Sequence, residues 1–253
     1  MQRLRANPGK KALRCIDNCF YVRLPVRTHV VKNDDNLTDV LIKYAKPHLR
    51  TNDIVFISEK MVAITQGRAF FIDDIKPSFM AKFLSKYVYK SPHGIGLGSP
   101  WTMELALREA GYLKIFFAAL AAAVTKPFGI KGVFYKICGR GIAAIDGPCS
   151  YTLPPYNKYA VLAPAKPNEV AKELSKVLDT AVIIVDANDL GVDIVGKSTD
   201  KISDDFIKSA IKDNPLGQSA QQTPIGIIRK VNIVKKVTIP AKSSKLIKVK
   251  IDA

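Results

Sequence analysis

The stretch VIIVDANDLGVDIVG, residues 182–196, places four apolar residues directly before a group of polar ones. Such an apolar run is typical of a strand that is buried on both faces. The polar side chains that follow it, before a turn expected at Gly196, are Asp186, Asn188, Asp189 and Asp193. A buried strand holds the residues at its end rigidly, and rigidly held carboxylates can coordinate a cation.

A second apolar run, IAAID, delivers Asp146 just before Gly147 and Pro148. We interpret it as the second of two short strands within 129–155, so that two strands end in an aspartate. Hard cations such as Mg²⁺ and Mn²⁺ prefer oxygen ligands, and two neighbouring strand ends could share one or two ions. The alternative is that Asp186 and Asp189 cap the turn after their strand. Both interpretations remain open on the pattern alone.

The remaining pattern mixes strands, hairpins and helices, and it indicates an α+β fold with mixed α/β sheets. Helices are expected over 37–49, 77–89, 102–124, 167–178 and 203–212. Extended chain is expected over 19–31, a strand from 53 up to a polar step at 58–60, a turn at Gly67, a polar loop over 213–226 and a β-hairpin around 240–244. The glycine-spaced run 91–100 lacks the ending of a P-loop, so we interpret it as a lid or connector.

The longest uncharged apolar run, from Ile115 to Val124, is about half as long as a membrane span. We therefore expect a buried helix whose second half is covered on all sides, and no membrane partner. The N-terminal residues do not lead into a signal-peptide pattern, which predicts a cytoplasmic protein.

Positive charge is concentrated at the two ends of the chain. The formal net charge is +17, residues 1–14 hold five Lys or Arg and no acid, and residues 229–250 hold eight and no acid. We divide the chain into a basic segment 1–19, a main domain 20–228, and a basic C-terminal hairpin 229–253 that belongs to the same domain. The basic ends would attract nucleotides or nucleic acid, but solvated lysine-rich edge strands explain them equally well.

Several pieces of the chain occur in the order seen in one enzyme family. These pieces are LPVRTHVV, VFISEKMVAITQGR, SPWTMELALREAG, GRGIAAIDGPCS, AVIIVDAND and DNPLGQSAQQT. Together they resemble the coenzyme F420-0:γ-glutamyl ligase family over most of residues 20–225. The resemblance implies an intertwined, two-lobed homodimer that uses GTP, Mg²⁺ or Mn²⁺, and K⁺. The implied reaction joins L-glutamate to a phosphorylated deazaflavin precursor through an amide bond.

The resemblance assigns roles to particular residues. Asp146 and Asp186 match metal-binding aspartates of the family, and with Lys60 they are the catalytic residues that we expect. Metal ligation by Asn188 and Asp189 is the expected replacement for a lost ligand. The residues expected to bind the nucleotide are Leu24, Pro25, Val26, Glu59, Lys60, Arg68, Gly217 and Gln218.

Three positions depart from the family pattern. Ala187 stands where the family has a metal-binding Thr, Ile64 where a Lys contacts the nucleotide, and Cys149 where an Asn follows the first Asp. Each replacement removes a polar contact, so Lys60 or Arg68 would have to serve the phosphates. The alternative reading is a divergent relative that binds nucleotide or nucleic acid through its basic surface.

Overall fold

The computed structural model describes residues 4–88, 95–130, 132–188 and 191–232. Eight strands are β1 (Leu13–Ile16), β2 (Cys19–Val26), β3 (Ile54–Ser58), β4 (Ala69–Phe71), β5 (Tyr159–Val161), β6 (Ala181–Asn188), β7 (Gly191–Lys197) and β8 (Ile225–Val231). Nine α-helices are α1 (Leu37–Tyr44), α2 (Glu59–Thr65), α3 (Phe79–Leu84), α4 (Pro100–Ala110), α5 (Tyr112–Thr125), α6 (Val133–Cys138), α7 (Arg140–Ala143), α8 (Pro167–Leu178) and α9 (Asp204–Ile211). Both counts cover the described ranges only, and short 3₁₀ turns lie at 46–48, 72–74, 126–128 and 156–158.

The main sheet has six strands in the order β1-β2-β8-β3-β6-β7, and β4 pairs with β5 in a separate two-stranded sheet. Strands β3 and β6 run parallel, whereas the other pairs in the main sheet are antiparallel. The predicted mixture of strands and helices in an α+β arrangement is confirmed. Because β3 and β6 are parallel, the residues after Ser58 and Val185 lie next to each other at the carboxyl end of β3, where β6 continues to Asn188.

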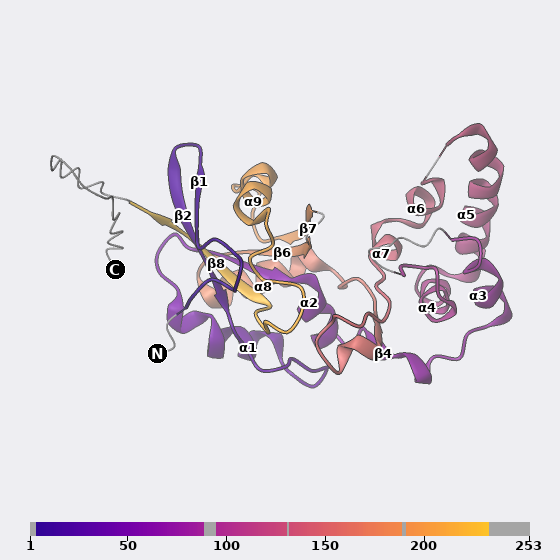
Figure 1. The fold of residues 1–253 in the computed structure, drawn as a ribbon, viewed down its shortest axis with the longest axis horizontal. Helices are drawn as coiled ribbons and strands as arrows, with labels where there is room; N and C mark the ends of the chain where they lie inside the picture. The colour runs from indigo at the N-terminus through magenta and orange to yellow at the C-terminus, as the bar shows by residue number, and fades with distance from the viewer. Residues whose placement is uncertain (1–3, 89–94, 131, 189–190, 233–253) are drawn as a thin grey trace.

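Helices cover both faces of the main sheet (Figure 1). Side chains of α1, α2 and α8 pack with Val55, Ile57 and Val182 on one face. Helix α9 packs with Phe56 and Ile183 on the other face. This alternation along β3 explains why the central strands read as continuous apolar runs.

Strand β8 approaches β3 closely at a residue that has no side chain. Gly226 pairs with Phe56 of β3, and a Cβ atom at Gly226 would lie 2.1 Å from the Phe56 ring. The Phe56 ring therefore occupies the space over the glycine. The expected polar loop over 213–226 ends two residues early, since its last two residues already belong to β8.

A second lobe is built from helices α3 to α7 around its own core (Figure 1). Fully buried Leu107, Ile115 and Ala118 belong to this core, together with Ala160 of β5. The two lobes are joined through the chain around β4 and β5.

Helices 167–178 and 203–212 are confirmed within one residue, and helix 37–49 is found as α1 followed by a 3₁₀ turn. The turn at Gly67 is confirmed by its φ of +70°. Helix 77–89 is shorter than predicted. The chain does not turn at Gly196, because that residue continues β7.

Two predictions in the second lobe are wrong. The single helix over 102–124 is divided at Gly111, whose φ of +85° ends α4 and starts α5. The two short strands expected within 129–155 are the helices α6 and α7, since Gly132 and Gly139 start short turns that pack on the second core. Cys138 of α6 and Ile142 of α7 are buried in that core, so tertiary packing overrides the β propensity of the preceding VFYKI sequence.

Helix α5 is also not covered on all sides, as its apolar sequence led us to expect. Ile115 and Ala118 are buried, but Leu113 is 75% exposed and Phe117 is 61% exposed. Among the described residues, no helix is long and apolar enough to cross a bilayer. The hairpin expected around 240–244 and most of the glycine run 91–100 lie outside the described residues.

Candidate functional site

Two acidic residues lie side by side in the main sheet, at the carboxyl end of β3. Ser58 of β3 pairs with Val185 of β6, and the next residues along the two parallel strands are Glu59 and Asp186. Glu59 begins α2 and is 8% exposed. The parallel pairing therefore brings the two carboxyl groups to one edge of the sheet.

A third carboxyl group reaches the same edge from the other lobe. Asp146 follows α7 rather than a strand, which corrects our expectation that two strands end in aspartate. Its backbone N–H donates to the Val161 carbonyl at 2.9 Å, and the Val161 N–H donates back at 2.9 Å. This isolated bridge to β5 fixes the backbone of Asp146 against the base of the second lobe.

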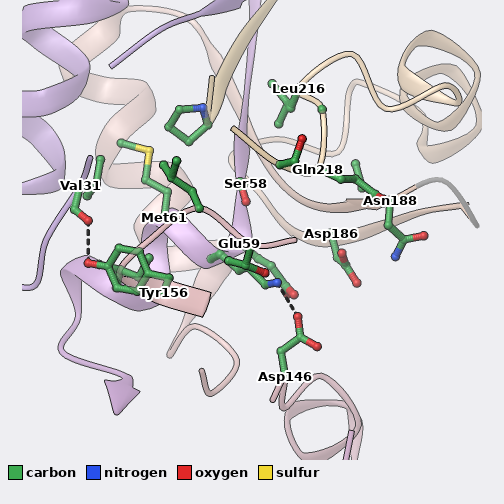
Figure 2. Close-up of a pocket in the computed structure, with 18 of the residues that line it drawn as sticks. Val31, Ser58, Glu59, Met61, Asp146, Tyr156, Asp186, Asn188, Leu216 and Gln218 are labelled. Atoms are coloured by element: carbon green, nitrogen blue, oxygen red, sulfur yellow. Dashed lines mark hydrogen bonds and ion pairs between the residues drawn. The ribbon is translucent and has the colours of Figure 1, made fainter. Parts of the chain in front are cut away.

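Lys60 connects the two lobes at this point. Its Nζ atom lies 2.5 Å from Oδ2 of Asp146, as Figure 2 shows. Lys60 comes directly after Glu59 in the first turn of α2, so one helix end supplies both the buried acid and the cation that faces Asp146.

The charges at this edge perturb one another strongly. Burial, and then the negative charge of Asp186, raise the pKa of Glu59 to about 8. Burial and the charge of Asp146 raise the pKa of Asp186 above its usual range. Burial disfavours the ammonium of Lys60, but the neighbouring carboxylates, Asp146 first, raise its pKa. The site thus concentrates more negative charge than Lys60 neutralises by itself.

Arg140 supplies a second positive charge beside the cluster. Its Nη2 atom lies 2.5 Å from Oδ2 of Asp193, which pairs with Asp186 across β6 and β7. The charge of the Arg140 guanidinium acts to lower the pKa of Glu59 and of Asp186. Burial has the larger, opposite effect, so both pKa values remain raised. Our sequence analysis missed Arg140, although its place in the GRG turn six residues before Asp146 was a usable signal.

Glu59, Lys60, Asp146 and Asp186 line one cavity of about 710 Å³ (Figure 2), whereas Arg140 and Asp193 do not line it. This volume lies in the range of small-molecule sites. Residues of both lobes form its wall, and they come from 28–31, 58–64, 143–146, 151–156, 185–188 and 216–224. The cavity is therefore polar at the carboxylate end and apolar near Met61 and Val31.

The loop 214–223 forms another part of the wall, and hydrogen bonds from the N-terminal segment hold its backbone. Gly217 has a φ of +79°, and a Cβ atom there would lie 2.5 Å from the Gln221 side chain. The Asn7 amide donates to the carbonyls of Pro215 at 2.9 Å and Leu216 at 3.1 Å. The N-terminal segment thus positions the backbone that borders the cavity.

The segment 28–31 and Tyr156 form the wall opposite the carboxylates. The Tyr156 hydroxyl donates to the Val31 carbonyl at 2.6 Å, which closes the apolar end of the cavity. The sequence analysis named neither as a site residue, because the contact joins positions far apart in the chain.

Comparison with known protein families matches residues 25–194 to F420-0:gamma-glutamyl ligase. The chain belongs to the F420-0:gamma-glutamyl ligase family. The matched region holds Lys60, Asp146 and Asp186, and it covers most of the cavity wall. No curated protein matches the chain. Membership in the family suggests a ligase role in F420 biosynthesis, with small-molecule substrates such as glutamate and F420 precursors.

Most of the residues that the ligase resemblance singled out meet at this cavity. The ones that line it are Glu59, Lys60, Asp146, Asp186, Asn188, Gly217 and Gln218. The side-chain oxygen of Asn188 also accepts a hydrogen bond from the Gly191 N–H at 3.1 Å. Asp189 lies outside the described residues.

Four other residues expected near the nucleotide lie elsewhere. Leu24, Pro25 and Val26 pair with β8 inside the sheet, and none of them lines the cavity. The Arg68 side chain donates to the Ala163 carbonyl at 2.6 Å and pairs with Glu109 at 2.6 Å, away from the cavity. The structure therefore gives Arg68 contacts that join the two lobes, because its guanidinium lies between β5 and α4.

The three departures from the ligase family pattern differ in their location. Ile64 and Ala187 line the cavity, so two polar groups of the family pattern are replaced by apolar ones at its wall. Cys149 does not line it and interacts with Tyr151. Within the described ranges, no group of three or more His, Cys, Asp or Glu side chains is arranged to hold a metal ion.

Proposed function

We propose that this protein is an amide ligase that joins L-glutamate to the carboxyl group of a phosphorylated deazaflavin precursor, using GTP and a divalent metal ion. The observation that carries the proposal is the meeting of Lys60, Asp146 and Asp186 at one cavity from two lobes. Family membership supports the reaction class. A divergent relative that acts on another small acid is the closest variant of this proposal.

The donor set at the cavity suits a hard divalent cation. Carboxylate oxygens of Asp146 and Asp186 and the amide oxygen of Asn188 are the ligands that Mg²⁺ and Mn²⁺ prefer. Burial and mutual repulsion raise the pKa of Asp186, and a bound cation would relieve that repulsion. When bound, such an ion would polarise the phosphoryl group and neutralise its charge. Asp189 is retained as a further candidate ligand.

The chain's own residues would then position the reactants. Lys60 would face the negative charge that develops as a carboxylate oxygen attacks the γ-phosphorus and the bond to GDP breaks. The amine of glutamate would attack the acyl phosphate, and phosphate would leave. Glu59, with a pKa of about 8, would in its ionised form accept one proton from the attacking amine, so this proton transfer should become faster as the pH rises towards 8. Gly217 and Gln218 would border the nucleotide.

The direct test is turnover by the purified full chain with GTP, Mn²⁺, L-glutamate and the deazaflavin precursor. Mass spectrometry should show a product heavier by one glutamate, and GDP should form in equal amount. Asp186→Asn should abolish turnover without changing the melting temperature by more than a few degrees. Asp200→Asn is the matched control, since Asp200 is exposed on the surface and pairs with Lys197. Unimpaired turnover by Asp186→Asn would refute the assigned role.

Nucleotide choice, ions and assembly need separate measurements. A thermal-shift panel of GTP and ATP, with and without Mn²⁺, should show stabilisation by GTP that depends on the metal. Replacing K⁺ by Na⁺ tests the potassium requirement. Light scattering tests the homodimer, and fractionation of cells tests the cytoplasmic location that we propose.

A further inference from the structure

Helix α5 carries an exposed apolar stripe. It consists of Leu113, Phe116, Phe117, Leu120 and Val124, which are spaced so that they follow one face of the helix. The opposite face, with Ile115 and Ala118, is buried in the core of the second lobe. The stripe is therefore held outward by a packed helix and is not part of a loose end.

Further apolar side chains lie at the same end of the molecule. Phe128 and Ile130 follow α5 and are 78% and 52% exposed. Phe79 and Phe83 of α3 and Tyr87, three residues after its end, form a row of neighbouring rings with centroids 6.4 and 5.1 Å apart. Helices α3 and α5 both lie at the end of the molecule furthest from β1 and β2 (Figure 1). Exposed apolar residues gathered in this way mark an interaction surface.

The lobe that carries the α5 stripe is strongly positive. Residues 76–146 include ten Lys or Arg and three acids, a difference of +7. All three acids are engaged, because Glu104 pairs with Arg108, Glu109 with Arg68 and Asp146 with Lys60. Exposed lysines flank the stripe at both ends of α5, Lys114 at its start and Lys126 just after it. The positive charge around the stripe therefore favours an anionic partner.

Charge and side-chain type together distinguish three possible partners of the stripe: a second copy of the chain, a nucleic acid and an anionic bilayer. In a symmetric contact, a second copy would bring the same positive lobe against itself. A nucleic acid would stack on the phenylalanines but would leave Leu113, Leu120 and Val124 without a role. An anionic bilayer offers acyl chains to the apolar stripe and phosphate headgroups to the lysines.

We propose that the α5 stripe docks the protein on the surface of an anionic lipid bilayer, with α5 lying in the plane of the headgroups. With 14 residues, α5 is about 21 Å long. Our expectation of no membrane partner assumed that α5 is covered, and its exposure removes that premise.

The test is flotation of the full-length protein with phosphatidylcholine vesicles, with and without phosphatidylglycerol. The wild type should float only with the anionic vesicles, and less at high salt. Phe117→Glu/Leu120→Glu should weaken binding by about tenfold or more, since two apolar anchors are lost. Ile42→Glu is the matched control, because Ile42 is 41% exposed on α1 in the other lobe. Circular dichroism and the melting temperature verify the fold of each variant.

A second variant reports directly on insertion. Phe117→Trp should show a blue-shifted emission that brominated lipids quench, measured against the wild type with Trp101 alone. Three results would overturn the proposal. The first is no flotation of the wild type. The second is flotation that the double variant leaves unchanged, which would assign binding to the basic ends. The third is a dimer that the double variant dissociates, or RNA binding that it abolishes, without vesicle binding.

Discussion

Lys60 of α2 and Asp146 of the second lobe form an ion pair of 2.5 Å across the cavity, although 86 positions separate them in the chain. The pair is the point where the charged groups of the two lobes meet. Both side chains are about half exposed, so the pair contributes little to stability. Its significance lies in placing a cation among carboxylates whose pKa values are raised.

Removing the charge of Lys60 should therefore impair activity more than folding. Lys60→Met should lower glutamate-dependent GTP hydrolysis by roughly 10²-fold, the size expected for loss of one group that stabilises a charged transition state. The melting temperature should change little. Lys197→Met, on the surface beside Asp204, is the matched control and should keep full activity. Equal activity of the Lys60→Met variant and the wild type would exclude Lys60 from the reaction.

The buried carboxyl of Glu59 should make the stability of the protein depend on pH. Its pKa is about 8 in the fold and 4.5 ordinarily, so between these values the folded protein binds more protons than the unfolded chain. The free energy of unfolding should fall as pH rises through this window, by up to ~1.4 kcal/mol per pH unit. Asp186, whose pKa is also raised, contributes in the same direction.

Glu59→Gln should flatten this dependence and stabilise the protein at pH 8, as measured by urea unfolding at several pH values. Glu104→Gln is the contrasting control, because hydrogen bonds from Ser78 and the charge of Arg108 overcome burial and lower the pKa of Glu104. At pH values above 4.5, the ordinary pKa of a Glu side chain, the Glu104→Gln variant should be less stable than the wild type, because it lacks the stabilised carboxylate. A Glu59→Gln variant with an unchanged slope would show that Glu59 is not the group that titrates.

A buried ion pair at the far end of the sheet should be important for stability. Arg229 of β8 donates to both carboxylate oxygens of Asp53, at 2.8 and 2.6 Å, and Asp53 is 2% exposed. Arg229→Met should lower the free energy of unfolding by about 3–5 kcal/mol, since it leaves a buried carboxylate without its partner. Asp53→Asn/Arg229→Met should recover part of this loss in urea unfolding. If the double variant were no more stable than Arg229→Met, loss of the Asp53 partner would not be the cause of the destabilisation.

The close approach of β8 to β3 should make Gly226 intolerant of any side chain. Gly226→Ala should destabilise the protein by a few kcal/mol, because the new methyl group would overlap the Phe56 ring. Phe56→Leu/Gly226→Ala should be less destabilised than the sum of the single variants predicts. Gly191→Ala in β7 is the control, since the space around Gly191 is open. The measurement is the melting temperature of Gly226→Ala, Phe56→Leu, the double variant and Gly191→Ala.

Local patterns in the sequence determined the helices 167–178 and 203–212 and the apolar strand 182–185, although β6 continues through Asp186 to Asn188. These elements depend on neighbours in the chain, so periodicity and caps suffice to predict them. Only the tertiary structure decided that Asp146 follows a helix, that β8 lies in the middle of the sheet, and that α5 is exposed.

The same division holds for the site. The sequence and the family resemblance pointed to Glu59 and Lys60 and to Asp146 and Asp186 as a pair, but not to Arg140 or to the wall at 28–31. Which charges meet depends on the parallel pairing of β3 with β6 and on the bridge between Asp146 and Val161. Such contacts join segments far apart in the chain, and no local pattern encodes a distance in space.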